Sequence, residues 1–198
     1  MGDQWSYLFS THRSTNSASY YTTYKREKNT NYNRSVKMSR TRVGIGQDSH
    51  RFLDPHSIKP CTIGGLIFPE APGLDADSDG DVVFHAICNA ITSVTGAAIL
   101  GDIAIKLCHK DGVTDSQIYL EHALKTLGKQ KIEHVALTIE GKRPRLQKKI
   151  DEMRESIAKV MQLEISQVGL TVTSGDGLTD FGCGDGLQCF CILTTIEH

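Results

Sequence analysis

Carboxylates and imidazoles that suit metal-ion chemistry occur at two places in this sequence. At the first, Asp48 and His50 stand two residues apart where a predicted strand ends. Residues i and i+2 of an extended chain project to the same face, so the two side chains converge as a pair of metal ligands. The alternative is a surface ion pair, which is the commoner outcome for such a pair taken alone.

The second place is the stretch 75–88, which begins as an acidic loop and ends as a helix. Four carboxylates fall within residues 75–81, and apolar residues then recur at helical spacing around His85. An imidazole therefore lies near a helix N-terminus beside an acidic loop. Taken alone, the stretch is more typical of a capped helix, with Ser78 or Asp79 as N-cap and His85 as a partly buried histidine.

Two further segments have the composition of phosphate-binding sites. Residues 141–145, Gly-Lys-Arg-Pro-Arg, form the densest basic cluster after residue 40. Residues 173–177, Thr-Ser-Gly-Asp-Gly, combine two hydroxyls with flexible backbone amides. Cations at a strand end and small-residue loops suit a phosphate-bearing ligand, and each segment alone also suits an ordinary surface turn.

The elements that must position these residues follow from hydrophobic periodicity and turn residues. A strand begins at Arg42, where Val43 and Ile45 alternate with glycines. A hairpin turns at Gly64-Gly65. The remaining expected elements are helices over 79–99, 115–127 and 146–160 and strands over 133–140, 168–172 and 187–195. This order predicts an α+β two-layer sandwich: a mixed four-stranded sheet with helices on one face, its other face covered by self-association.

The composition fits one soluble domain without a nucleic-acid-binding surface. The chain has 198 residues, 39% of them hydrophobic, which is enough for one substantial core. Its formal net charge is -1, so any anionic ligand is met by a local site. Six cysteines without a CxxC pair are typical of reduced thiols in a cytosol-like compartment. We expect no membrane partner, because no apolar run approaches the length that crosses a bilayer.

Residues 1–40 differ in composition from the rest of the chain. Ser, Thr, Asn and Tyr dominate, and only Asp3 and Glu27 are acidic. We expect a flexible extension or a mis-started segment, with Met38 as the alternative start, followed by one folded domain over 41–198. A Ser- and Arg-rich, acid-poor N-terminus is also typical of a transit peptide, so the expected location is the cytoplasm and the alternative is a plastid.

Several motifs, taken in order, resemble one family. They are Gly46–Phe52, Gly64-Gly65, Ser78–Val82 with His85, Leu100–Asp102, Thr173–Gly175 and Gly182–Gly186. Asp-x-His followed by Ser-Asp-Gly-Asp-x-x-x-His resembles the 2-C-methyl-D-erythritol 2,4-cyclodiphosphate synthases of non-mevalonate isoprenoid biosynthesis, and looks like their chlamydial branch. The resemblance covers about residues 42–197.

The resemblance implies a bacterial cytoplasmic homotrimer whose sheets line the centre and whose active sites lie between adjacent subunits. The implied substrate is 4-diphosphocytidyl-2-C-methyl-D-erythritol 2-phosphate. Its 2-phosphate oxygen attacks the β-phosphate, which expels CMP and closes the 2,4-cyclodiphosphate. Because this phosphoryl transfer is intramolecular, positioning and charge neutralisation supply nearly all of the catalysis.

The resemblance also implies two metal sites. By motif position, Asp48, His50 and His85 hold a zinc-like divalent ion, Zn or Mn, with a fourth position left for a β-phosphate oxygen. Asp176 falls where the family has a glutamate, and would help to hold a second ion, Mg or Mn, that comes with the substrate.

The remaining implied roles concern the substrate. Ser174 and Asp77 are the implied catalytic residues at the diphosphate, Asp102 matches the ribose-binding aspartate, and residues 141–146 match the segment that encloses the cytosine and its phosphate. The full set of implied substrate-binding residues is Ser49, Ser78, Asp102, Ile103, Gly141, Lys142, Arg143, Pro144, Arg145, Leu146 and Thr173.

Three departures from the family pattern keep alternatives open. Asp77 stands where many members have a histidine, Cys183 replaces a common arginine, and residues 107–111 replace a longer loop. One alternative is a catalytically weakened trimeric homologue that binds a nucleotide or diphosphate. Another is a metal-dependent phosphohydrolase, which would use water as nucleophile and release inorganic phosphate.

Overall fold

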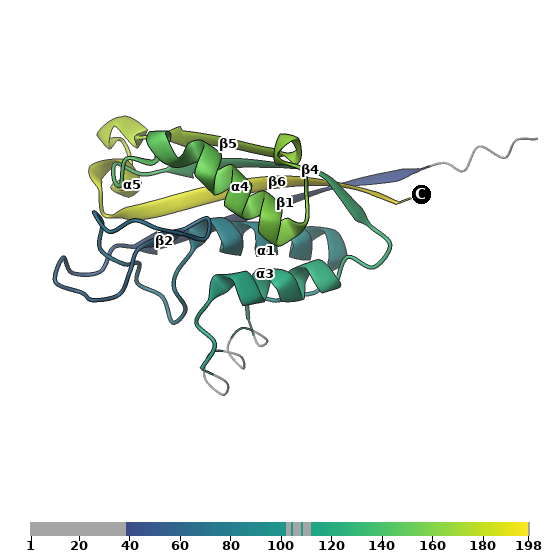
Figure 1. The fold of residues 1–198 in the computed structure, drawn as a ribbon, viewed down its shortest axis with the longest axis horizontal. Helices are drawn as coiled ribbons and strands as arrows, with labels where there is room; N and C mark the ends of the chain where they lie inside the picture. The colour runs from purple at the N-terminus through teal and green to yellow at the C-terminus, as the bar shows by residue number, and fades with distance from the viewer. Residues whose placement is uncertain (1–38, 102–103, 105–107, 109–111, 198) are drawn as a thin grey trace, which may run out of the picture. The chain divides into compact units, whose positions relative to one another are not determined.

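A mixed four-stranded sheet organises the fold (Figure 1). The computed structural model describes residues 39–101, 104, 108 and 112–197. The strands are β1 (Arg40–Arg51), β4 (Lys131–Glu140), β5 (Val168–Thr173) and β6 (Gly186–Glu197), in the order β1-β6-β4-β5. β4 and β5 are parallel and the other two pairs are antiparallel. The mixed four-stranded sheet predicted from the sequence is therefore confirmed.

The two faces of this sheet have different surroundings. Gly46, Cys191, Leu137 and Leu170 stand side by side in register across the four strands, and all of them are buried. The opposite face carries large apolar side chains that are exposed: Val43 64%, Ile45 63%, Phe190 42% and Ile192 49%. The residues that the structure describes thus leave one apolar sheet face uncovered.

Among the residues that the structure describes, three helices cover the buried face. α1 (Val82–Thr95) packs on β1 and β6, and α4 (Ile150–Met161) packs on β5. α3 (Ser116–Lys125) contacts both α1 and α4, which places the helices on the same side of the sheet, as predicted (Figure 1). Within the described ranges, no helix has the length and apolar character needed to cross a membrane.

α1 lies unusually close to β1 because two glycines of the strand face it. A Cβ atom at Gly46 would lie 2.1 Å from the Ala86 carbonyl oxygen, and one at Gly44 would lie 2.2 Å from that of Ala90. The backbones of strand and helix are therefore in direct contact. This contact sets the distance between side chains at the end of β1 and those in the first turns of α1.

The limits of α1 differ from the predicted 79–99. Asp81, and not Ser78 or Asp79, is the N-cap: its carboxylate accepts hydrogen bonds from the backbone N–H groups of Val83 and Phe84. The helix ends at Thr95, because Gly96 adopts the left-handed conformation with φ 76°. The acidic residues before Asp81 therefore form a loop.

The other elements largely follow the expected order. The predicted hairpin, formed by β2 (Thr62–Ile63) and β3 (Leu66–Ile67), is confirmed. The N-cap of α3 is Asp115. α3 ends before 127, at Lys125, and the helix expected over 146–160 is split into η1 (Leu146–Lys149) and α4. The segments expected as loops contain η2 (Ile165–Gln167), η3 (Gly175–Gly177) and α5 (Asp180–Cys183). The predicted extension lies outside the described residues, except for 39 and 40.

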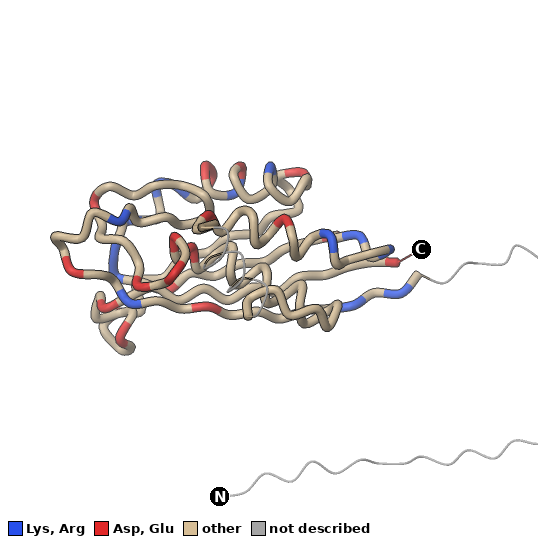
Figure 2. The backbone as a smooth tube through the Cα atoms, turned by 90° about the horizontal axis from the view of Figure 1, so that it is seen from below, with Lys and Arg blue, Asp and Glu red and all other residues tan. Residues whose placement is uncertain are grey.

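Lysine and arginine residues gather where β1 begins and β6 ends (Figure 2). Arg40 pairs in register with Glu197, and Lys131 of β4 lies opposite Ile196 of the same strand end. Asp48 and His50 occupy the other end of β1. This group of basic residues thus lies at the end of β1 opposite to the predicted metal ligands.

Candidate metal centre

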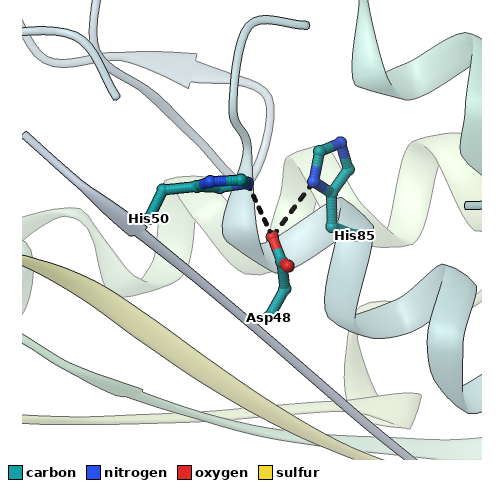
Figure 3. Close-up of side chains that lie close together, drawn as sticks. All are labelled: Asp48, His50 and His85. Atoms are coloured by element: carbon teal, nitrogen blue, oxygen red, sulfur yellow. Dashed lines mark hydrogen bonds and ion pairs between the residues drawn. The ribbon is translucent and has the colours of Figure 1, made fainter. Parts of the chain in front are cut away.

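The three predicted metal ligands lie together at the junction of β1 and α1 (Figure 3). Asp48 and His50 project from the same face of β1, as their spacing predicts, and His85 projects from the first turns of α1. One ligand atom from each residue lies within 4.8 Å of the others. The close approach of α1 to Gly46 brings these two elements into range.

Asp48 is the centre of this cluster. Its Oδ2 atom lies 3.0 Å from His85 Nδ1 and 3.0 Å from His50 Nε2. Burial raises the pKa of the Asp48 carboxyl, but the contacts with His50 and His85 outweigh it and lower the pKa to about 2. The carboxylate is therefore ionised at neutral pH, so it accepts hydrogen bonds and donates none.

The cluster has the features expected of a site that holds a cation. His50 Nε2 is buried and, although near Asp48, has no hydrogen-bond partner among the described residues. Two imidazoles and one carboxylate form a typical ligand set for catalytic zinc, with a fourth position left for substrate or water. The residues present thus fit a divalent ion.

Two serine hydroxyl groups contact the other ring nitrogen of His85, Nε2. Its Nε2 atom lies 2.9 Å from the Ser116 hydroxyl of α3 and 3.3 Å from the Ser78 hydroxyl. The Ser116 hydroxyl donates a hydrogen bond to Asp79. Ser116 was not predicted from the sequence, because a serine next to the N-cap residue Asp115 is common in the first turn of a helix.

The acidic loop is joined to the hairpin through Asp81. This fully buried carboxylate accepts hydrogen bonds from Gly64 N (2.9 Å) and Gly65 N (2.7 Å) in addition to the two helical N–H groups that it caps. Four backbone donors on one carboxylate compensate for its burial. Asp81 thus fixes the start of the helix that carries His85.

A cavity of about 660 Å³ opens beside the three ligands. Asp77 and Ser78, both predicted to contact substrate, line it together with Asp48, His50 and His85. Tyr119 and Cys108, which the sequence analysis did not assign, also line it. The predicted ribose-binding Asp102 and its neighbour Ile103 lie outside the described residues, as do 107 and 109–111 of the replaced loop.

The basic segment 141–145 and the loop 173–177, which carries two hydroxyl groups, both line a second cavity. This one measures about 440 Å³, and its lining includes the following predicted residues: Gly141, Lys142, Pro144, Arg145, Leu146, Thr173 and Ser174. It shares no lining residue with the cavity at the metal ligands. The fold therefore brings the predicted nucleotide-binding residues together, but not onto the metal centre.

Three predicted residues lie elsewhere. Ser49 lines a smaller cavity of about 250 Å³ with His50 and Arg51. The Arg143 guanidinium stacks 4.8 Å from the centre of the Phe52 ring, and its Nε donates to the Gly184 carbonyl. Asp176 is exposed and accepts a hydrogen bond of 2.7 Å from the Ser174 hydroxyl.

The sequence and the fold of this chain are similar to those of known proteins. A family model described as the YgbB family matches residues 41–196. The chain is 60% identical to a 2-C-methyl-D-erythritol 2,4-cyclodiphosphate synthase of Chlamydia felis over 158 residues, which cover 79% of this chain and 90% of the relative. A solved structure of such a synthase in a CDP-bound form is similar with a TM-score of 0.64 and 28% identity, over 78% of this chain and 99% of that chain. The CDP complex of IspF from Plasmodium falciparum shares the fold with a TM-score of 0.67 at 22% identity, over 79% of this chain and 96% of that chain.

Proposed function

The chain belongs to the YgbB family, and we propose on this premise that it is a 2-C-methyl-D-erythritol 2,4-cyclodiphosphate synthase, a lyase of non-mevalonate isoprenoid biosynthesis. The observation that carries this function is the assembled Asp48–His50–His85 cluster in a chain 60% identical to a synthase. Neither alternative is favoured, because relatives at this level of identity are named as synthases.

The reaction forms one phosphorus–oxygen bond and breaks another. An oxygen of the 2-phosphate attacks the β-phosphorus of 4-diphosphocytidyl-2-C-methyl-D-erythritol 2-phosphate, and the bond from that phosphorus to the bridging oxygen breaks. CMP leaves with the electron pair, and the eight-membered cyclic diphosphate remains. Since both reacting groups belong to one molecule, the residues need to hold them in line and neutralise their charge.

The metal centre would orient the β-phosphate. Asp48, His50 and His85 would hold the ion, a zinc-like Zn or Mn, which when bound supplies a positive charge and a Lewis acid for a phosphate oxygen. The ionised Asp48 makes the ligand set anionic before substrate arrives. Asp77 and Ser78, on the same cavity, would contact the substrate beside the ion.

The second cavity would hold the cytidine end of the substrate. Lys142 and Arg145 offer cations there, and the Thr173 and Ser174 hydroxyls offer hydrogen bonds to phosphate oxygens. Arg143, fixed against Phe52, would keep the segment in shape. Asp176, which accepts a hydrogen bond from Ser174, would help to bind a second ion, Mg or Mn, that arrives with the diphosphate.

A homotrimer would bring the two cavities together. Metal ligands and nucleotide-type residues line separate cavities of one subunit, so a neighbouring subunit is required to complete a site. Ser174 of one subunit would then face Asp77 of the next across the diphosphate. The exposed apolar sheet face offers the surface for such an assembly, since a large apolar patch marks an interaction site.

We also propose that residues 41–198 are the catalytic domain and that it works in a bacterial cytoplasm. The family match over 41–196 and the bacterial relatives support these two assignments.

The test is to incubate the purified protein with Mg²⁺ and Zn²⁺ or Mn²⁺ and the diphosphocytidyl substrate, and to follow products by ³¹P NMR and mass spectrometry. We expect CMP and the cyclic diphosphate in equal amounts, and no product from the Asp48→Asn variant. Inorganic phosphate without the cyclic product would establish a phosphohydrolase. Tight binding of CDP without turnover at saturating metal would establish the weakened binding homologue.

A further inference from the structure

A series of close polar contacts connects Asp48 to helix α3 through His85. His85 Nδ1 lies 3.0 Å from Asp48 Oδ2, and His85 Nε2 lies 2.9 Å from Ser116 Oγ. The Ser116 hydroxyl in turn contacts Asp79 Oδ1, and the Ser116 backbone N–H donates to Asp79 Oδ2 at 3.2 Å. Each group in this series has a defined hydrogen-bonding role.

The roles follow from counting protons. The Asp79 carboxylate can only accept, so the single proton of the Ser116 hydroxyl points to Asp79. The hydroxyl oxygen is then left as an acceptor toward His85, which requires a proton on Nε2. In a neutral imidazole with that proton on Nε2, the lone pair is on Nδ1. No proton then lies between Nδ1 and the acceptor-only Asp48 Oδ2, 3.0 Å away, so both atoms offer lone pairs to a cation.

Several hydrogen bonds hold the Ser116–Asp79 end of this series of contacts in place. Ser116 is fully buried, so water cannot replace its hydroxyl. Asp79 accepts a further hydrogen bond of 3.1 Å from Asp81 N, and its own N–H donates to the Thr114 carbonyl at 2.7 Å. Ser78 lies farther from His85 Nε2, at 3.3 Å, and its hydroxyl already accepts from Gly80 N. Ser116 is therefore the main partner of Nε2.

We propose that Ser116 and Asp79 are positioning residues that make His85 an Nδ1 metal ligand with a fixed ring angle. This inference rests on the proposed metal centre and adds the two residues, neither of them a ligand, that orient it. Partners of this kind set the tautomer and orientation of a ligating histidine, and their loss typically weakens metal binding by about 10- to 100-fold. Helix α3 would thereby affect the affinity for the metal ion, although Ser116 does not contact the ion.

The test compares Ser116→Ala with a matched control in the same helix. Thr126→Ala removes a hydroxyl that donates to the Ala123 carbonyl at the opposite end of α3. Co²⁺ binding is measured by chelator competition and by the visible absorption of the bound ion. We expect about 10- to 100-fold weaker binding and an altered spectrum for Ser116→Ala, and wild-type behaviour for Thr126→Ala. Ser116→Thr, which keeps a hydroxyl, is expected to restore much of the affinity.

A second readout follows the tautomer directly. In protein with ¹⁵N-labelled histidine and bound Zn²⁺, NMR is expected to show His85 protonated at Nε2 in the wild type and a changed nitrogen pattern in Ser116→Ala. Asp79→Asn, which keeps the shape of the carboxylate, is the substitute if circular dichroism shows that Ser116→Ala does not fold. Unchanged affinity and tautomer in the folded variants would overturn the proposal. Failure of the wild type to bind Co²⁺ in a manner that depends on Asp48 would instead overturn the metal centre itself.

Discussion

Replacing Gly46 by alanine is expected to separate the two elements that carry the metal ligands. The added Cβ would lie 2.1 Å from the Ala86 carbonyl oxygen and 2.3 Å from Ala90 N. Both atoms belong to the backbone of α1, so no side-chain rotation relieves the clash. Ordinary contact begins near 3.4 Å, so the gap must widen by about 1 Å (3.4 − 2.1 = 1.3).

This displacement has two measurable consequences. Overpacking of a tight interface costs about 1–3 kcal/mol, which denaturant unfolding would report as a lower free energy of unfolding. His85 would move by a similar distance from Asp48, which it now meets at 3.0 Å. A misplacement of about 1 Å can reduce turnover by about 100-fold, and the affinity for Co²⁺ is expected to fall with it.

Gly169→Ala provides the matched control. Gly169 is also a strand residue, but an added Cβ there would lie 3.5 Å from its nearest neighbour, the ring of His134, which is an ordinary contact. We expect wild-type metal affinity and a stability that is unchanged or slightly higher. Equal metal affinity and turnover in Gly46→Ala and Gly169→Ala would refute the role assigned to the strand–helix contact.

Four other predictions follow from the structure. Asp81→Asn presents an amide NH₂ group to a backbone N–H of the hairpin and is expected to lower the free energy of unfolding by about 1–3 kcal/mol in urea titrations; an unchanged midpoint would show that these bonds contribute little. In metal-free protein, the lowered pKa of Asp48 stabilises the fold at pH values above the ordinary pKa of 3.8, and this stability is lost as the pH falls toward about 2. The difference in unfolding free energy between wild type and Asp48→Asn is therefore expected to shrink by about 2 kcal/mol between pH 5 and pH 2. A difference that stays constant over this range would contradict the prediction. Dialysis against a chelator is expected to abolish CMP release while circular dichroism stays unchanged, and Zn²⁺ or Mn²⁺ is expected to restore it; activity that survives complete metal removal would exclude the metal centre. Ile45→Asp places a charge on the exposed apolar sheet face and is expected to yield monomers in sedimentation velocity, with loss of turnover; an unchanged trimer would place the interface elsewhere.

The ligand pair on β1 and the turn of the hairpin could be predicted because they depend on local spacing. Asp48 and His50 share a face in any extended strand, and Gly64-Gly65 specifies a tight turn wherever it stands. His85 could be placed near a helix start for the same reason. These features do not depend on which segment packs against them.

The start of α1 and the support of His85 could not be predicted, because distant segments decide them. Asp79 and Asp81 are equivalent in a local pattern of alternating acids, and Asp81 becomes the cap because Gly64 and Gly65 also donate to it. Ser116 is separated from His85 by 31 residues, so no periodicity connects the two. The end of the helix at Gly96 was likewise hidden within an apolar run that continues to Leu100.

The separate positions of the two cavities have a genetic consequence. In the proposed trimer, a chain that lacks His85 still offers an intact nucleotide-type cavity, and a chain that lacks Lys142 still offers an intact metal centre. When two such defective chains assemble together, some of their interfaces combine the two undamaged halves. Two inactive alleles expressed in one cell would therefore complement each other, whereas two alleles that damage the same cavity would not.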